Sequence, residues 1–202
     1  MDTVLLETKR LYIGEFKPDM ALKVSQGSLD EDTRKFLPDE VFETEEEAKE
    51  TLEFLISQYH DGNPLVYPLI LKTDDSYIGY VEAVYLKDGS YEIGYHINEE
   101  YRRKGYIKEA LSVFIPYILR IKKIDEIYGV VDANNIASIR VLENTGFKKV
   151  YEGIARYHHQ DKQIVKYIYK ESLGNMSSNW LFINDYCFLK NEHYENIFLN
   201  SF

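Results

Sequence analysis

Alternating apolar and polar residues dominate the middle of the chain. Between residues 65 and 97, three apolar runs rich in Tyr, Val and Ile are separated by "KTDDS" and "KDG". Such runs are typical of strands, and Asp and Gly are typical of the turns that join antiparallel strands. We therefore expect a three-stranded antiparallel meander in this part of the chain.

A helical period appears on both sides of the predicted meander. The apolar positions of residues 45–59 recur at i, i+4, i+7, i+8 and i+11, which is one stripe of an amphipathic helix. Thr44 and Glu47 have the spacing of a capping box at its start. A second helix of about 15 residues is expected from Gly105, and Pro116 is expected to kink or shorten it.

The remaining segments complete the order of elements. We expect a first strand at 10–16, short helices within 18–40, a strand at 124–133, a helix at 134–146, and strands at 147–154 and 163–171. Antiparallel strands followed by a strand–helix–strand crossover are typical of a mixed sheet. The predicted fold class is therefore α/β (α+β), a mostly antiparallel sheet of about seven strands with helices on both faces.

Composition indicates one packed domain with an appendage. The chain has 202 residues, of which 45% are hydrophobic, including 18 Tyr and 10 Phe. These residues are enough for a core, and we place the domain at 1–171. Residues 172–202 follow a Gly/Asn/Ser stretch and are rich in aromatic residues and asparagine. We expect this extension to pack against the N-terminal helices, where it covers part of the acceptor cleft or reaches the second subunit of a homodimer; an ill-ordered terminal extension is the alternative.

Charge narrows the classes of partner. A net charge of −10 argues against nucleic acid or an anionic membrane as the main partner. It fits a cationic acceptor, but it also fits solubility alone, which is the simpler interpretation. The single cysteine, Cys187, cannot form an intrachain disulfide, and the first residues lack the pattern of a signal peptide. These features lead us to expect a cytoplasmic protein.

A local basic cluster interrupts this acidic sequence. A glycine at the start of a helix lets a bound group approach the backbone, and the first-turn N–H groups have no partner within the helix. Together with the helix dipole, they form an anion site. The cations around Gly105 are Arg102, Arg103, Lys104 and Lys108. An ordinary solvated basic turn is the alternative interpretation.

Two sequence blocks resemble the GNAT family of N-acetyltransferases. The stretch "RRKGYI" after "EIGYHI" is similar to its Arg/Gln-x-x-Gly-x-Gly/Ala loop, in which Arg102 and Gly105 match and Ile107 replaces the small third residue. The later stretch "VVDANNIASIRVLENTGF" resembles the Asn-x-x-Ser…Glu-x-x-Gly-Phe signature of the ribosomal-protein N-terminal alanine acetyltransferase (RimJ/RimL-like) branch. The matching residues are Asn135, Ser138, Glu143, Gly146 and Phe147. The resemblance covers residues 5–171.

The resemblance implies acetyl-CoA as co-substrate, with no metal. Its pyrophosphate would bind the backbone amides of residues 103–108, which are Arg103, Lys104, Gly105, Tyr106, Ile107 and Lys108. His96 and Ile97, at the end of the preceding strand, would pair with the pantetheine chain. Asn135 and Ser138 would lie on the other side of that chain. The adjacent His158 and His159 are expected to be a loop or surface pair, because no third metal ligand has suitable spacing.

The resemblance also implies direct attack of a primary amine on the thioester in a ternary complex. Glu92, on an otherwise apolar strand, is the candidate base through a water; a carboxylate pointing to solvent is the alternative. Other family members use a tyrosine as the acid where this chain has Leu142. In the ribosomal-protein branch the serine takes that role, so Ser138 is the candidate acid; an ordinary helix hydroxyl is the alternative.

The acceptor amine stays open at this point. A protein N-terminus, a polyamine, an aminoglycoside antibiotic and an amino acid all remain, because the acceptor cleft would be built from the N-terminal helices. The pKa of an α-amine is ~7.8 and that of a lysine ~10.4, so freeing a lysine costs about 3.5 kcal/mol more. A non-catalytic acetyl-CoA-binding regulatory module with the same fold is the rival class of function.

Overall fold

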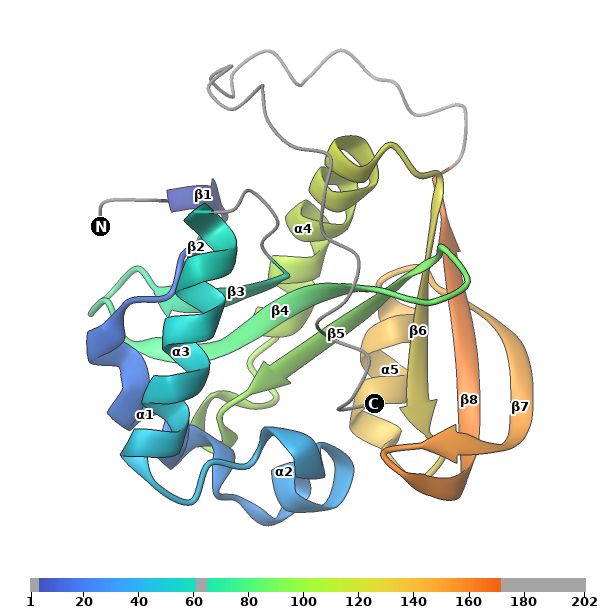
Figure 1. The fold of residues 1–202 in the computed structure, drawn as a ribbon. Coiled ribbons are helices and arrows are strands. Elements are labelled where there is room, and N and C mark those ends of the chain that lie inside the picture. Colours follow the sequence, from blue (N-terminus) through green and yellow to red (C-terminus); the bar gives the residue numbers. More distant parts are fainter. Residues whose placement is uncertain (1–3, 61–64, 172–202) are drawn as a thin grey trace.

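The protein contains one mixed sheet in a computed structural model that describes residues 4–60 and 65–171 (Figure 1). The strand order is β1-β2-β3-β4-β5-β6-β8-β7. Neighbouring strands are antiparallel except β5 and β6, which are parallel. The predicted fold class is confirmed, and the short β1 is the strand that the sequence pattern did not predict.

The elements follow the predicted order. The strands are β1 (Val4–Glu7), β2 (Leu11–Gly14), β3 (Val66–Leu71), β4 (Tyr77–Tyr85), β5 (Tyr91–Ile97), β6 (Glu126–Asp132), β7 (Lys148–Tyr157) and β8 (Gln160–Lys170). The α-helices are α1 (Ala21–Ser28), α2 (Glu31–Phe36), α3 (Glu45–His60), α4 (Tyr106–Lys122) and α5 (Ile136–Asn144). Short 3₁₀ turns are η1 (Pro18–Met20), η2 (Pro38–Glu40) and η3 (Glu99–Tyr101).

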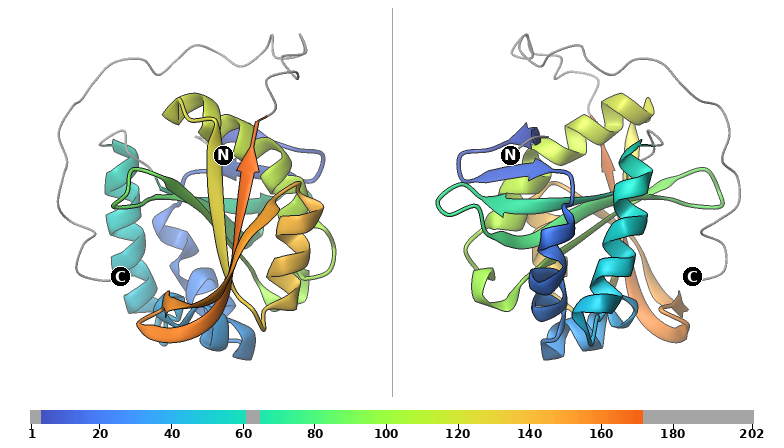
Figure 2. Two further views of the ribbon diagram at one scale, coloured as in Figure 1. Left: turned by 90° about the vertical axis from the view of Figure 1, so that its right-hand side faces the viewer. Right: turned by 60° about the vertical axis from the view of Figure 1, so that its left-hand side comes forward.

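Helices cover both faces of the sheet (Figure 2). The helices α4 and α5 lie on one face, over a core that includes Phe114, Leu111 and Ile93. The helices α1 and α3 lie on the other face, where Val24 and Leu52 pack in a second cluster. Because side chains alternate along a strand, residues of β4 and β5 point in turn toward each of these two layers.

The start of α3 confirms the predicted cap. The Thr44 hydroxyl accepts a hydrogen bond from the Glu47 N–H at 3.2 Å, and the Glu47 carboxylate accepts one from the Glu43 N–H at 2.8 Å. Ala48 and Leu52 of the predicted apolar stripe are buried. The N-terminal half of this helix therefore follows from local sequence signals.

The length of α4 differs from the prediction. The helix has 17 residues and continues past Pro116 to Lys122. Proline removes one backbone hydrogen bond of the helix. On either side of it, Phe114, Ile115 and Ile118 are almost fully buried, so packing of the apolar face outweighs that loss. Of the two effects expected of Pro116, a kink or a shortening, the shortening is not observed.

The two adjacent histidines form the turn between β7 and β8. His158 and His159 have φ values of 47° and 60°, the positive-φ pattern of a two-residue hairpin turn. The expectation of a loop pair is confirmed. His158 Nδ1 lies 2.8 Å from Asp39 Oδ2, so this turn approaches η2.

Within the described ranges, no helix is long and apolar enough to cross a membrane. The predicted 172–202 extension lies outside the described residues.

Candidate active site

The site begins where two parallel strands separate. Glu92 of β5 faces Tyr128 of β6, and it is the one register pair between these strands. From there β5 and β6 diverge toward their C-terminal ends (Figure 1). The Asn98 N–H donates to the Ile78 carbonyl of the neighbouring strand at 2.9 Å. Strand periodicity therefore turns the backbone groups of Ile97 and Tyr95 to the opposite edge, which faces the gap.

The backbone beside Gly105, at the start of α4, is accessible to a bound group. Gly105 precedes the helix in a left-handed conformation with φ of 76°, and Arg103 also has a positive φ of 60°. A side chain at Gly105 would meet no atom closer than the Arg10 Nη2 at 3.7 Å. The space beside Gly105 is therefore open at the start of the helix, where the first-turn N–H groups have no partner within the helix.

The cations of the predicted cluster divide into two groups. Arg103, Lys104 and Lys108 are exposed beside the loop. Arg102 instead turns toward α2, as described below. Ile107, the departure from the family loop, is 6% exposed and packs in the core beneath α4. Its larger side chain therefore does not project into the open side of the loop.

Arg10, which the sequence analysis did not single out, holds this loop from the turn between β1 and β2. Its Nη1 donates to the Lys104 carbonyl at 2.9 Å, and its Nε donates to the Glu109 carboxylate at 2.6 Å. Its guanidinium lies 4.2 Å from the centre of the Tyr106 ring. These contacts join residues about ninety positions apart in the chain, so no local pattern reveals them.

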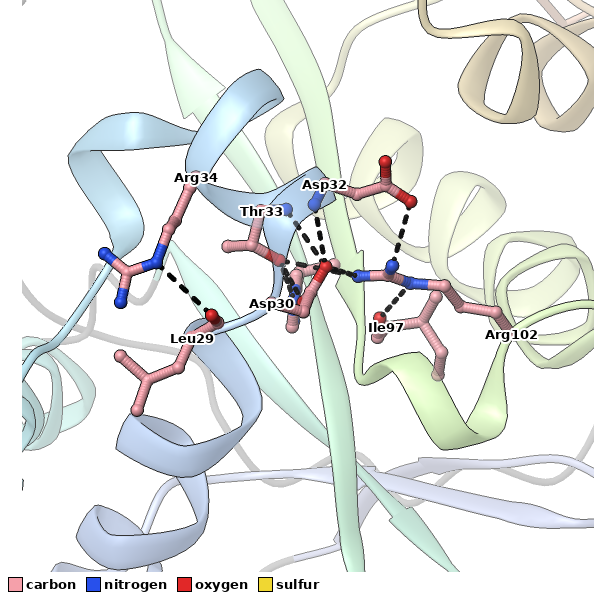
Figure 3. A network of polar contacts seen from close by, with 8 residues as sticks. Leu29, Asp30, Asp32, Thr33, Arg34, Ile97 and Arg102 are labelled. Carbon is pink, nitrogen blue, oxygen red and sulfur yellow. Dashed lines mark hydrogen bonds and ion pairs between the residues drawn. The ribbon is translucent and has the colours of Figure 1, made fainter.

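Arg102 links the loop to α2 (Figure 3). Its Nη2 donates to Asp30 Oδ1 at 2.7 Å, its Nη1 donates to Asp32 Oδ2 at 3.0 Å, and its Nε donates to the Ile97 carbonyl at 3.1 Å. Burial raises the pKa of Asp30, but hydrogen bonds from Thr33 and Arg102 outweigh it and leave that pKa below its ordinary value. The guanidinium thus acts here as a brace between two segments.

His96 and Ile97 have different surroundings. The Ile97 carbonyl faces the gap and accepts from Arg102. His96 is buried, its Nε2 lies 3.0 Å from Thr33 Oγ1, and its ring stacks on Tyr80 with centres 5.6 Å apart. Burial, followed by the charge of Arg102, lowers the His96 pKa to about 4. Because the His96 backbone faces β4, Ile97 is the better placed of the two to pair with a pantetheine chain.

A pair of hydroxyl groups lies on the α5 side of the gap. Asn135 caps α5, and its Oδ1 accepts from the Ser138 N–H at 3.0 Å. Ser138 Oγ lies 2.8 Å from the Tyr95 hydroxyl, and burial raises the pKa of Tyr95. Leu142 is 1% exposed and packs against Gly129 of β6. Tyr95 was not predicted, because its contact with Ser138 depends on how α5 docks on the sheet.

Carboxylates lie on the opposite face of β4 and β5. In the strand register Glu82 faces Gly94, and Val84 faces Glu92, so both glutamates point to the same side. A Cβ on Gly94 would lie 2.1 Å from Glu82 Oε1, which shows that the Glu82 side chain lies over this glycine. Burial and the charge of Glu82 raise the Glu92 pKa to about 7, against the opposing charge of Lys166.

Glu40 of η2 belongs to the same region. It lines a small cavity of about 10 Å³ together with Tyr77, Tyr80 and His96. Burial, followed by the charges of Glu82 and Asp39, raises the Glu40 pKa well above its ordinary range. Glu40 and Glu82 were not predicted, since neither stands in a motif and only the strand register and the position of η2 bring them near Glu92.

Comparisons with known proteins agree with this geometry. The family model for the acetyltransferase (GNAT) domain matches residues 10–148. The uncharacterized N-acetyltransferase YnaD of Bacillus subtilis is 31% identical over 71% of this chain and 82% of its own length. The uncharacterized N-acetyltransferase p20 of Bacillus licheniformis is 25% identical over 83% of this chain and 94% of its own length.

Solved structures share the fold. A GNAT-family acetyltransferase from Bacillus anthracis superposes with a TM-score of 0.71, at 24% identity, over 82% of this chain and 97% of that one. A ribosomal-protein-S5-alanine acetyltransferase from Vibrio fischeri gives a TM-score of 0.69, at 18% identity, over 82% of this chain and 95% of that one. The family match covers more than half of the chain, and the chain therefore belongs to the GNAT acetyltransferase family as an acyl-CoA-dependent N-acetyltransferase.

Proposed function

We propose that the protein transfers the acetyl group of acetyl-CoA to a primary amine by direct attack within a ternary complex. The observation that carries this proposal is the gap between β5 and β6, which ends at Glu92. On one side of it lie Tyr95 and Ser138, and on the other lie Glu92 and Glu82. The gap thus separates a hydroxyl pair that can donate a proton from carboxylates that can accept one.

Acetyl-CoA supplies an activated acyl group and three phosphates that need cationic or N–H partners. The open amides after Gly105 suit the pyrophosphate, and Arg103, Lys104 and Lys108 add positive charge around it. The Ile97 backbone, at the edge of the gap, suits the amide groups of the pantetheine chain. Residues of this one loop would then hold the nucleotide end, while the strand gap orients the thioester.

Glu92 is the proposed base. A carboxyl with a pKa of about 7 is ionised in half of the molecules at neutral pH, and it is a stronger base than an ordinary glutamate. It accepts the proton of the attacking amine, directly or through one water, while the new N–C bond forms. The C–S bond then breaks, and Ser138, hydrogen-bonded to Tyr95, donates a proton to the departing thiolate.

The test is the release of CoA thiol by the full-length protein with a panel of primary amines. Glu92→Gln should lower kcat about 10²–10⁴-fold while the Kd for acetyl-CoA stays within about twofold. In the wild type kcat should rise with pH through about 7, because the base acts in its ionised form, and the variant should lose this dependence.

Glu53→Gln, at an exposed position of α3, is the matched control and should behave as the wild type. A loss of less than about threefold for Glu92→Gln at every pH would remove Glu92 from the chemistry. Binding of acetyl-CoA with no release of thiol for any amine would instead favour the non-catalytic regulatory module.

A further inference from the structure

The carboxylates of the candidate site form a row along the β4–β5 pair. Successive cross-strand pairs on this face are Tyr80 with His96, Glu82 with Gly94, and Val84 with Glu92. Glu40 lies at the first of these pairs, because it lines the same cavity as Tyr80 and His96. Each step of two residues advances about 6.7 Å along the strand, so three carboxylates occupy about 13 Å.

Two buried polar atoms at one end of this row have no hydrogen-bond partner. They are Glu40 Oε2 and the hydroxyl oxygen of Tyr80, and both residues line the cavity of about 10 Å³. Native proteins pair nearly all of their buried polar atoms, so an unpaired carboxyl oxygen and an unpaired hydroxyl on residues that line one cavity indicate a missing partner. An ammonium group donates three hydrogen bonds, and its positive charge would balance the carboxylates at this end of the row.

The protein places little positive charge near the carboxylates of this row. Across residues 4–60 and 65–171, no ion pair involves Glu40, Glu82 or Glu92. The nearest influence is Lys166, whose charge acts on Glu92 alone. Partly buried carboxylates without ion pairs disfavour their charged forms unless a cation joins them.

A metal ion does not suit this arrangement. The carboxylates are spread along the strands, and the described part of the chain contains no cluster of three His, Cys, Asp or Glu residues close enough to hold one. A row of acceptors spaced by two residues instead matches several cationic groups held at intervals on a flexible chain. Ammonium groups separated by methylenes have this form.

We infer that the acceptor is a linear aliphatic diamine or polyamine, with its reacting amine at Glu92, its next ammonium group at Glu82 and, in a triamine, a third group at Glu40. This inference rests on the proposed acetyl transfer. An extended chain advances about 1.3 Å per bond, so four methylenes place two nitrogens about 6 Å apart, which is one step of the row. A longer triamine spans two steps and reaches Glu40.

The reaction balances for such an acceptor. The near group enters as an ammonium and gives one proton to Glu92, and the neutral amine nitrogen then bonds to the acetyl carbon while the C–S bond breaks. The thiolate receives a proton from Ser138, and the second proton that leaves the nitrogen returns to Ser138 through solvent. The ammonium group at Glu82 keeps its proton throughout. In a monoamine or a simple peptide N-terminus the reacting nitrogen is the one cationic group, so such acceptors leave Glu82 and Glu40 without a positive partner.

The test compares two acceptors of equal length with the full-length protein and acetyl-CoA. Butane-1,4-diamine and 4-amino-1-butanol differ in one terminal group, which is an ammonium in the first and a hydroxyl in the second. We expect kcat/KM for the diamine to exceed that for the amino alcohol about 10–100-fold, measured as CoA thiol and as product mass. A linear triamine should be at least as good as the diamine.

Variants test whether the carboxylates of the row cause the preference for the diamine. Glu82→Gln should reduce the diamine-to-alcohol ratio of kcat/KM by about tenfold, Glu40→Gln should reduce the triamine-to-diamine ratio, and Glu53→Gln should leave both ratios unchanged. Circular dichroism and melting temperature report whether each variant folds, and the wild-type comparison stands without them. Equal kcat/KM for the two wild-type acceptors, or faster transfer to a peptide N-terminus, would overturn the inference. Absence of transfer to every amine would contradict the proposed function itself.

Discussion

Substitution of Arg102 tests whether this residue stabilises α2 or binds a phosphate of acetyl-CoA, because its side chain cannot do both with the same hydrogen-bond donors. In the structure its guanidinium joins Asp30 and Asp32 of the α2 segment to the Ile97 carbonyl (Figure 3). We predict that Arg102→Ala lowers the free energy of unfolding through the loss of this brace. Asp30→Asn should lower it through the same interaction.

The magnitude follows from burial. The side chains of Arg102 and Asp30 are 23% and 11% exposed, and a hydrogen bond between charged groups contributes about 1.5–3 kcal/mol. The Asp32 carboxylate is 66% exposed, so its pair adds at most about 1 kcal/mol. Arg102→Ala should therefore cost about 3 kcal/mol in total. For a chain of this size, that loss lowers the melting temperature by about 6–12 °C.

A double-mutant cycle isolates the Arg102–Asp30 pair. Asparagine caps helices as well as aspartate does, so Asp30→Asn keeps the α2 cap and removes the charge. Urea unfolding of the two single variants and the double variant should give a coupling energy of about 1.5–2 kcal/mol. The coupling should be complete at pH 7. It should decline as pH falls below about 4, because the lowered Asp30 pKa stabilises the folded state only above that range. A coupling below about 0.5 kcal/mol at pH 7 would refute the brace.

Acetyl-CoA titrations of the same variants show whether Arg102 acts as a brace for α2 or as a ligand of the phosphate. If Arg102 braces the loop, Arg102→Ala and Asp30→Asn should weaken binding to a similar degree, and the salt dependence of Kd should match that of the wild type. If Arg102 binds phosphate directly, Arg102→Ala alone should weaken binding, and the salt dependence should become shallower. This second outcome would contradict the arrangement in Figure 3 for the bound protein.

Two further predictions concern the two ends of the acetyl-CoA site. Gly105→Val should weaken acetyl-CoA binding at least about tenfold by calorimetry, since it blocks the open amides and strains a positive φ, whereas Gly89→Val imposes similar strain in a distant turn and should not. Equal affinity in both variants would place the site elsewhere. Ser138→Ala should lower kcat about 10–100-fold and Tyr95→Phe less, and a larger loss for Tyr95→Phe would make Tyr95 the acid.

Short-range sequence patterns were sufficient to predict the strands and the helix start that carry the site residues. The turn residues and apolar runs of 65–97 predicted the meander that carries Glu92, and the Asn at the start of 134–146 is the cap that positions Ser138. These features depend on residues a few positions apart, where propensity and hydrogen bonding act directly. Pro116 is the exception, because burial of the α4 face decides the length of that helix.

The partners of the site residues could not be predicted in the same way. The contacts of Arg102 with Asp30, of Tyr95 with Ser138, and of Arg10 with the α4 loop connect residues 43 to 99 positions apart. Such contacts depend on strand register and helix docking. The alternation within β5 places Glu92 on the face opposite Ile93, but it does not say which residues of distant elements meet that face.

Three departures from ordinary packing rules lie around the gap. The parallel pair β5–β6 separates after Glu92, two positive φ values precede α4, and the face beside the gap carries glutamates that form no ion pair in the described part of the chain. Each departure costs stability in the free protein. Departures of this kind concentrate where a ligand supplies the missing partner. An anion at the positive-φ loop, an amide chain along the open strand edge and a cation over the glutamates would satisfy all three at once, which is why one ternary complex accounts for the site better than separate structural explanations.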